Sequence, residues 1–277
     1  MSDVIERTEL ILPEPARALG ALLGVPVPDF DKGEGLPLLW HWIYLLDRPA
    51  QADLGPDGHP VRGTLPAPPG PGRRRMWAGG WVKTSGTLRC GVPATKRSTV
   101  MSVTEKQGRT GPLTFVTVGH QIAQDDGLVV YEEQEIVYRE TSSAAQPPAA
   151  SAQADEGPMM PAGDGEWEIE VSPTLLFRFS ALTYNAHRIH YDRDFTRDVE
   201  GYPGLLTHGP LQALAMAEAA RALGVTGDVS FEYRLISPLF DYQGLVVGAV
   251  PGKDATTTFA RDRHGRQTAT GTIKPAG

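Results

Sequence analysis

Three histidines close together form the densest group of side chains able to do chemistry in this sequence. His187 and His190 lie in the segment Phe179–Asp192, and His208 stands just before a helical pattern that starts at Pro210. The group follows an apolar extended segment and precedes a helix. Loops held between rigid elements commonly carry function, and a helix start offers free N–H donors. We therefore expect the functional site here.

Residue type alone leaves three interpretations of His187 and His190 open. As zinc ligands they have the spacing i, i+3, whereas the helical HExxH motif has i, i+4, and no third ligand stands at a known spacing. As structural residues they would bond carbonyl groups at a turn. As an acid–base site, a histidine titrating near neutral pH would act beside helix N-terminal donors. Order and spacing favour acid–base chemistry, and we expect no bound metal.

The surrounding pattern predicts the elements that hold this segment. We expect helices at Glu14–Leu23, Leu36–Leu46 and Pro210–Leu223, the last followed by Gly224 as a C′ glycine. Extended segments are expected at Trp77–Leu88, Ala94–Lys106, Leu113–Ala123, Leu128–Tyr138, Trp167–Val171, Thr174–Leu182, Asp228–Ile236, Gly244–Val250, Thr256–Arg261 and Thr268–Lys274. The turn from Gln124 to Gly127 predicts a hairpin. A long helix combined with several antiparallel strands occurs in each half of the chain, and this repeated order predicts the α+β class.

Two proline-rich segments interrupt this pattern. The segment 52–72 predicts a long surface loop, because its prolines exclude a helix or a central strand. The segment 141–165 is small, polar and proline-rich, which predicts a linker between residues 1–140 and residues 166–277.

Composition excludes several classes of protein. The net charge is −7, so a nucleic-acid partner is not expected. Charged residues make 21% and hydrophobic residues 40% of the chain, and no apolar run is long enough for a transmembrane helix. Cys90 is the only cysteine, which excludes an internal disulfide. No glycine-rich phosphate loop is present. We expect a cytoplasmic protein without a membrane partner.

The histidine-rich segment resembles the signature of the MaoC-like (hydratase 2) branch of hot-dog-fold proteins. That signature is an acid, a spacer, Asn, Pro, an aliphatic residue and the catalytic His, followed later by a His-Gly pair that starts the central helix. In this chain the matching positions hold Asn185, Ala186, His187, Arg188, Ile189 and His190, and then His208 and Gly209. The acid of the signature is thus replaced by an amide.

The resemblance extends beyond the signature and is closest to one subgroup, the type 2 hydroxyacyl-thioester dehydratases with the itaconyl-CoA and mesaconyl-C4-CoA hydratases. Its further matches are Leu36–Trp42, Arg74–Gly80, Gly111–Val118 and Glu132–Arg139. It implies a double hot-dog fold, with two curled antiparallel sheets, each wrapped around a helix, joined edge to edge. Residues 1–140 would be a degenerate, substrate-binding half and residues 166–277 the catalytic half. A monomer and a homodimer both remain open.

The resemblance implies the reversible addition of water to the 2,3-double bond of an acyl-CoA thioester, with no cofactor beyond the coenzyme A of the substrate. His190 would be the general base. The N–H of Gly209, with His208 beside it, would stabilise the thioester oxyanion. Asn185 would position the water, because an amide takes no proton at neutral pH. Asp192 would either orient His190 or lie on a solvated turn, and we interpret His187 as structural.

Basic and aromatic residues suggest how the substrate binds. Arg188 would pair with the free carboxylate of a short C5 dicarboxylic acyl group, or with a protein acid. Arg73–Arg75 and Lys96–Arg97 would meet the phosphates of coenzyme A, or form a solvated face. Four tryptophans are expected to pack in the core: Trp40, Trp42, Trp77 and Trp81. The loop 52–72 is expected to cover the mouth of the site.

Other functions remain open on the same residues. A dehydratase of fatty or secondary-metabolite 3-hydroxyacyl thioesters would use the same site. A thioesterase would use Asn185 to position water at the thioester carbonyl. An acyl-CoA-binding protein would keep the fold without the base.

Overall fold

The fold is known from a computed structural model that describes residues 4–61, 73–108, 111–125, 127–140 and 158–276. The N-terminal half (described residues up to 140) contains β1 Val4–Leu10, α1 Pro13–Leu23, η1 Phe30–Lys32, η2 Trp40–Ile43, η3 Gln51–Asp53, β2 Arg73–Thr84, β3 Pro93–Gly108, β4 Gly111–Gln124 and β5 Gly127–Glu140. The C-terminal half (described residues from 158) contains β6 Glu166–Ile169, α2 Pro173–Leu182, η5 Arg188–His190, α3 Arg193–Asp198, α4 Gly209–Ala222, β7 Val229–Leu235, β8 Leu245–Pro251, β9 Thr256–Arg261 and β10 Gln267–Pro275.

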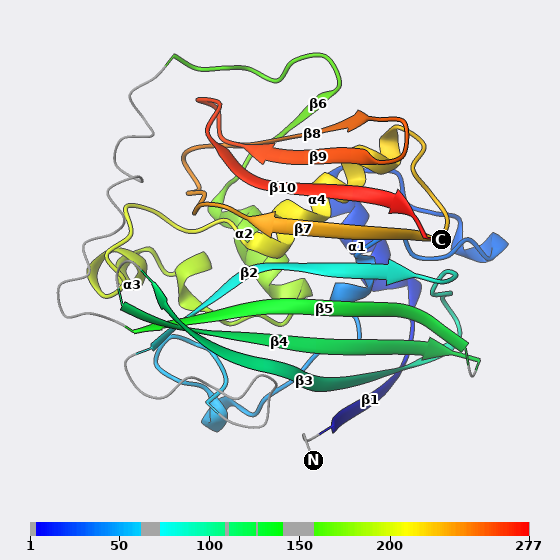
Figure 1. Cartoon of the computed structure of the whole chain (residues 1–277), viewed down its shortest axis with the longest axis horizontal. Coiled ribbons are helices and arrows are strands. Elements are labelled where there is room, and N and C mark those ends of the chain that lie inside the picture. The colour runs from blue at the N-terminus through cyan, green and yellow to red at the C-terminus, as the bar shows by residue number, and fades with distance from the viewer. Residues whose placement is uncertain (1–3, 62–72, 109–110, 126, 141–157, 277) are drawn as a thin grey trace.

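The ten strands form one antiparallel sheet in the order β1-β3-β4-β5-β2-β7-β10-β9-β8-β6 (Figure 1). The five strands of each half are therefore contiguous, and β2 joins β7 at the centre, from Gly79 opposite Arg234 to Lys83 opposite Ser230. A Cβ at Gly79 would lie 2.4 Å from the carbonyl oxygen of Tyr233, so this junction requires glycine. The α+β class and the edge-to-edge double hot-dog arrangement are confirmed.

Helices α1, α2 and α4 lie behind the sheet in the view of Figure 1, and α3 lies at the left, beside the ends of the strands. Helix α4 packs against β8, β9 and β10, while α1 packs against α2 and η2. Leu211, Leu214 and Met216 of α4 are completely buried. Because one apolar core includes residues of α1, α2 and α4, the two halves share their interior.

Most predicted elements are confirmed to within a few residues. The hairpin that ends β4 and starts β5 pairs Gln124 with Gly127, and Gly224 adopts a left-handed conformation after α4, with φ of 87°. The prediction of a linker at 141–165 falls mainly on residues 141–157, which lie outside the described residues. Over the part of the chain that the structure describes, no helix combines the length and apolarity needed to cross a bilayer.

Two predicted elements are wrong. The segment Thr174–Leu182 is not a strand but α2, because Pro173 occupies the first turn and the Ser172 hydroxyl caps the N–H of Leu175. The segment Leu36–Leu46 is not an α-helix and contains only the 3-10 turn η2. Leu39 and Leu45 have φ of 68° and 53°, and these left-handed conformations interrupt a helix on both sides of the turn.

Candidate active site

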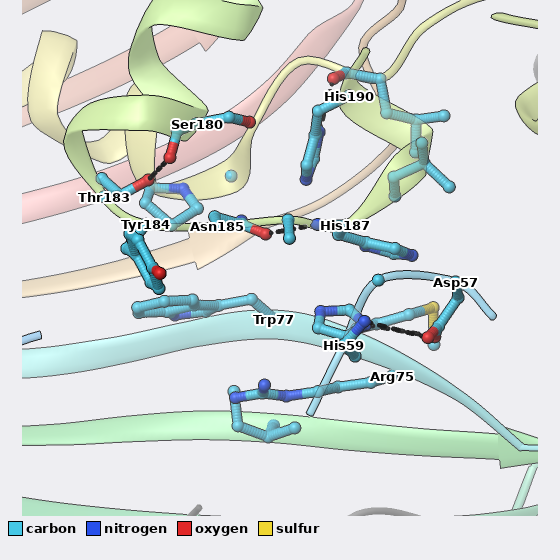
Figure 2. A pocket seen from close by; sticks show the side chains of 18 of the residues that line it. Asp57, His59, Arg75, Trp77, Ser180, Thr183, Tyr184, Asn185, His187 and His190 are labelled. Carbon is cyan, nitrogen blue, oxygen red and sulfur yellow. Dashed lines mark hydrogen bonds and ion pairs between the residues drawn. The ribbon is translucent and has the colours of Figure 1, made fainter. Parts of the chain in front are cut away.

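A cavity of about 1620 Å³ lies between the two halves, and both contribute to its walls. The C-terminal half provides Asn185, His187, His190 and Gly209, all of which the sequence analysis singled out. Figure 2 shows the side chains of Asn185, His187 and His190 above Trp77 and Arg75, which come from strand β2 of the N-terminal half. The tertiary structure thus brings the histidine-rich segment against the sheet of the other half.

His190 is oriented as a general base. Its Nδ1 lies 2.8 Å from the carbonyl oxygen of Leu206, and because a carbonyl only accepts, Nδ1 carries the proton and Nε2 keeps a lone pair. Burial lowers the pKa of His190 from 6.5 to about 4, so the ring is neutral at pH 7. In Figure 2 the ring points into the cavity, towards Asn185 and His187. The side chain therefore presents an unprotonated nitrogen to a ligand.

His208 supports His190 from behind and does not line the cavity. The two rings stack with centroids 3.6 Å apart and planes 18° apart, and His208 is 1% exposed. Its Nε2 lies 2.8 Å from the Ser180 hydroxyl on α2. Burial, followed by the nearby His190, lowers the pKa of His208 well below 6.5. The prediction that His208 contacts the substrate is therefore corrected: its ring fixes the plane of the His190 ring.

Asn185 is held in a tight turn at the end of α2. Tyr184, before it, has φ of 51°, and the Asn185 N–H donates to the carbonyl oxygen of Ser180 at 2.8 Å. The side-chain Oδ1 accepts the backbone N–H of His187 at 3.0 Å. One acceptor position of the amide therefore holds the turn, and the NH₂ group and the second lone pair of Oδ1 are the atoms that chemistry can use.

Gly209 starts α4 at the wall of the cavity. Its N–H is one of the first donors of the helix, which have no partner within the helix, and the helix dipole adds positive potential there. A Cβ at this position would lie 2.1 Å from Cδ1 of Leu235. A larger residue here would therefore have to displace the Leu235 side chain, and the absence of a side chain lets a ligand approach the N–H.

Arg188 and Asp192 bind each other outside the cavity. Nε and Nη2 of Arg188 donate to Oδ2 of Asp192 at 3.0 and 2.7 Å, and the guanidinium lies 4.1 Å above the Phe195 ring. Oδ1 of Asp192 caps the N–H of Phe195 at the start of α3. Neither residue lines the cavity. Of the two alternatives left open for Arg188, the structure shows the pairing with a protein acid, and the assignment of Arg188 to the substrate site is corrected. The alternative that Asp192 orients His190 is also excluded, because Nδ1 of His190 bonds the carbonyl oxygen of Leu206 instead.

A loop of the N-terminal half places two residues in the site that sequence reasoning missed. Asp57 accepts the backbone N–H of His59 at 3.0 Å, and its other oxygen lies 3.3 Å from Nδ1 of the same ring. The His59 ring lies 3.9 Å from the His187 ring, centroid to centroid. Burial lowers the pKa of His59; burial also opposes ionisation of Asp57, but the His59 hydrogen bonds outweigh it and lower the pKa of Asp57.

The sequence signal that could have identified Asp57 and His59 is an Asp-Gly-His turn between two prolines. It lies in the loop 52–72, which was expected only to cover the site. The described part of that loop, up to Val61, does lie at the cavity. Asp57, His59 and His187 also offer ligand atoms within 4.8 Å of one another, as a metal site would. However, the positive charge of Arg75 lowers the pKa of both imidazoles and would repel a metal cation. We therefore interpret the three as a polar wall of the cavity.

The other candidate binding residues divide between cavity and surface. Arg74, Arg75 and Lys96 line the cavity, whereas Arg97 pairs with Glu6 on the exposed edge. The side chain of Arg73 lies outside the described residues. The expectation that all four tryptophans pack the core is partly wrong. Trp40 is completely buried, and the cavity lining includes Trp42 and Trp77 but not Trp40 or Trp81.

Comparisons with known proteins identify the family of this chain. The family model for hydroxyacyl-thioester dehydratase type 2 matches residues 39–241. A mesaconyl-C(4)-CoA hydratase of Chloroflexus aurantiacus is 42% identical over 255 residues, which cover 92% of this chain and 87% of that protein. The crystal structure of HtdX of Mycobacterium tuberculosis has a TM-score of 0.66 at 14% identity, covering 99% of this chain and 100% of that one.

A second structure from Mycobacterium tuberculosis, described as a double hotdog fold, has a TM-score of 0.55 at 15% identity and covers 98% of this chain and 94% of that one. At these identities the structural matches establish the fold alone. The fold, the cavity and the family match together define a hydro-lyase of the double hot-dog class. The chain belongs to the type 2 hydroxyacyl-thioester dehydratase family.

Proposed function

We propose that this chain catalyses the reversible hydration of a 2,3-enoyl-CoA thioester, with a short C5 dicarboxylic acyl group of the mesaconyl-C4-CoA or itaconyl-CoA type as substrate. The observation that carries the proposal is the pairing of two groups at one cavity wall. These are the free Nε2 of a neutral His190 and the N–H of Gly209 at the start of α4. The 42% identical hydratase supports the choice of acyl group.

In the proposed mechanism, His190 moves one proton. Its Nε2 accepts a proton from water while the water oxygen bonds to C3 of the substrate, and the pair of electrons of the double bond passes to the thioester oxygen. The Gly209 N–H stabilises the resulting enolate oxygen. The enolate then takes the proton from His190 at C2. One water has been added, and the imidazole is neutral again.

Asn185 and His208 assist without taking a proton. Asn185 positions the attacking water through its amide, and the stacked His208 keeps the His190 ring in place. The N-terminal half would hold the acyl chain, with Lys96 available for the phosphates of coenzyme A. The scheme needs no cofactor. Whether the chain forms a homodimer, and whether it is cytoplasmic, stay predictions.

The test is to incubate the purified protein with mesaconyl-C4-CoA, itaconyl-CoA and crotonyl-CoA while following mass and free thiol. Addition of one water without thiol release, fastest with a dicarboxylic substrate, is the expected result. Preference for crotonyl-CoA or longer chains would instead indicate fatty-acyl dehydratase chemistry. Release of thiol would identify a thioesterase. No change with any thioester, together with tight binding, would favour the acyl-CoA-binding alternative.

A further inference from the structure

We propose that Arg75 binds the free carboxylate of the acyl group and thereby selects a dicarboxylic substrate. The inference rests on the proposed hydratase function and assigns the residue that recognises its substrate. Arg75 lies on β2, lines the cavity, and extends beneath His59 and Trp77 in Figure 2. It lines the same cavity as the catalytic segment but belongs to the opposite half of the molecule.

The charge of Arg75 lacks a fixed partner in the part of the chain that the structure describes. Among the residues that the structure describes, its guanidinium takes part in neither a hydrogen bond nor an ion pair, in contrast to Arg74, whose Nε lies 2.8 Å from a carboxylate oxygen of Glu200. Burial lowers the pKa of Arg75, yet a guanidinium does not lose its proton in proteins. A half-buried positive charge without a partner among the described residues is unfavourable, so this part of the cavity favours an anion.

The two acids whose charges act on Arg75 already accept hydrogen bonds from other residues. Asp47 and Asp57 both raise the pKa of Arg75 through their charges. Asp47, however, accepts a hydrogen bond from Nε of Arg7 at 2.6 Å, and Asp57 accepts two from His59. Tyr138 also faces Arg75, and burial raises its phenol pKa, so it contributes no charge at pH 7. The compensating anion is therefore expected from the ligand.

The position of Arg75 indicates the acyl carboxylate rather than a coenzyme A phosphate. The charge of Arg75 lowers the pKa of His187, whose ring centroid is 5.5 Å from that of His190. Lys96 is the second cation of the cavity that has no ion pair among the described residues, but it lies on β3, separated from β2 by β4 and β5. Its charge acts on His120 instead. Arg75 is thus the cation at the reacting end.

The chemistry of the substrate requires a cation at that end. In the C4 thioester of mesaconate, the free carboxylate and a methyl group are both attached to C3, the carbon to which water adds. Its receptor must therefore lie beside the water that His190 activates. A guanidinium binds a carboxylate through two parallel N–H donors, which also fixes the orientation of C3. Arg188, the arginine that the sequence suggested, is already bound to Asp192.

The test compares two thioesters that differ only at the recognised group. In 3-methylcrotonyl-CoA, a methyl group replaces the carboxylate of mesaconyl-C4-CoA. With Arg75→Gln we expect kcat/KM for mesaconyl-C4-CoA to fall about a hundredfold or more, as when one partner of a buried charge pair is removed. The value for 3-methylcrotonyl-CoA should stay within about threefold. Arg75→Lys keeps the positive charge but loses the two parallel N–H donors, so its kcat/KM for mesaconyl-C4-CoA should lie between those of the wild type and Arg75→Gln.

Two matched variants separate the alternatives. Lys96→Gln removes the other unpaired cation of the cavity and should affect both thioesters by the same factor. Arg178→Gln, on the exposed side of α2, controls for the change in net charge and should change neither. A selective loss with Lys96→Gln would overturn the assignment to Arg75. An equal loss of both substrates with Arg75→Gln, accompanied by weaker binding of free coenzyme A, would assign Arg75 to the phosphates and also overturn it.

Binding and stability provide readouts that do not depend on turnover. Calorimetry should show that Arg75→Gln weakens the binding of mesaconyl-C4-CoA and not of 3-methylcrotonyl-CoA. This result would support the inference even if the wild-type protein hydrated neither thioester. The absence of hydration would reject only the proposed function. The melting temperature of unliganded Arg75→Gln should equal or exceed that of the wild type, because an uncompensated charge is removed. A clear decrease would instead indicate a structural role and contradict the inference.

Discussion

The backbone N–H of Arg188 donates a 2.8 Å hydrogen bond to the carbonyl oxygen of Asp57. This bond ties the histidine-rich segment of the C-terminal half to the loop that carries His59 in the N-terminal half. The contact is close: Gly58 has φ of 86°, and a Cβ there would lie 1.8 Å from the carbonyl oxygen of Ala186. The cavity wall is therefore one structure made by two segments that are distant in the sequence.

The side chain of Arg188 strengthens this connection, which gives a first prediction. Its Nη1 donates to the Pro56 carbonyl at 3.0 Å while Asp192 holds the rest of the guanidinium. Arg188→Met should loosen the loop and lower kcat/KM by about tenfold, as expected for the loss of one to two hydrogen bonds to a charged group. The loss should be equal for mesaconyl-C4-CoA and 3-methylcrotonyl-CoA. Loss confined to the dicarboxylic thioester would return Arg188 to the role of carboxylate receptor.

The second prediction concerns the base. His190→Gln replaces the imidazole by an amide that cannot take up a proton, so hydration should slow by about a thousandfold, within the range for loss of general acid–base catalysis. His187→Gln, in the same segment, should cost no more than about tenfold because His187 is assigned no proton transfer. Steady-state kinetics of both variants check this. Comparable losses in the two would contradict the assignment of His190.

The third prediction is the pH dependence of activity and stability. Because burial lowers the pKa of His190 from 6.5 to about 4, kcat/KM should stay level down to about pH 5 and fall as pH drops through about 4. The unfolded chain binds its proton near 6.5, so this residue's contribution to stability is complete above pH 6.5 and is lost as pH falls towards 4. His190→Gln should reduce the pH dependence of the unfolding free energy over this window, measured by denaturant titration at several pH values.

The fourth prediction addresses the amide in the position where the family signature has an acid. Asn185→Asp keeps the acceptor for the His187 N–H and adds a negative charge facing His190. An anion within a few ångströms favours the imidazolium, so the pKa of His190 should rise and the acid limb of kcat/KM should move to higher pH. A pH–rate profile tests this. An unchanged limb would mean that the Asn185 side chain does not face the base.

The fifth prediction separates packing from catalysis at Gly209. Gly209→Ala places a methyl group against Leu235 and should lower stability by about 1–3 kcal/mol, the usual range for overpacking. The double variant Gly209→Ala with Leu235→Ala removes the obstacle and should recover part of that stability. If the substrate approaches the backbone N–H of residue 209 closely, the added methyl group still blocks it, and hydration remains slow in the double variant. Full recovery of activity would show that Gly209 serves packing alone.

Local patterns in the sequence determined much of this protein. Strands with β-branched residues, the hairpin at Gln124–Gly127 and the glycine after α4 were predictable because their causes are local: alternation, turn chemistry and a left-handed cap. The order from Asn185 to His190, followed by His208 and Gly209, also identified the segment that lines the cavity. The segment that became α2 was misjudged, since its apolar content outweighed the Ser-Pro signal that starts it.

Only the tertiary structure decided which side chains meet. Arg188 and Asp192 were plausible site residues by spacing, yet the turn at η5 lets their side chains form an ion pair outside the cavity. Arg75, Asp57 and His59 are distant from the motif in sequence, and they reach it because β2 joins β7 and a loop bonds to Arg188. Contacts between distant segments depend on chain topology and packing, and these leave no periodic signal in the sequence.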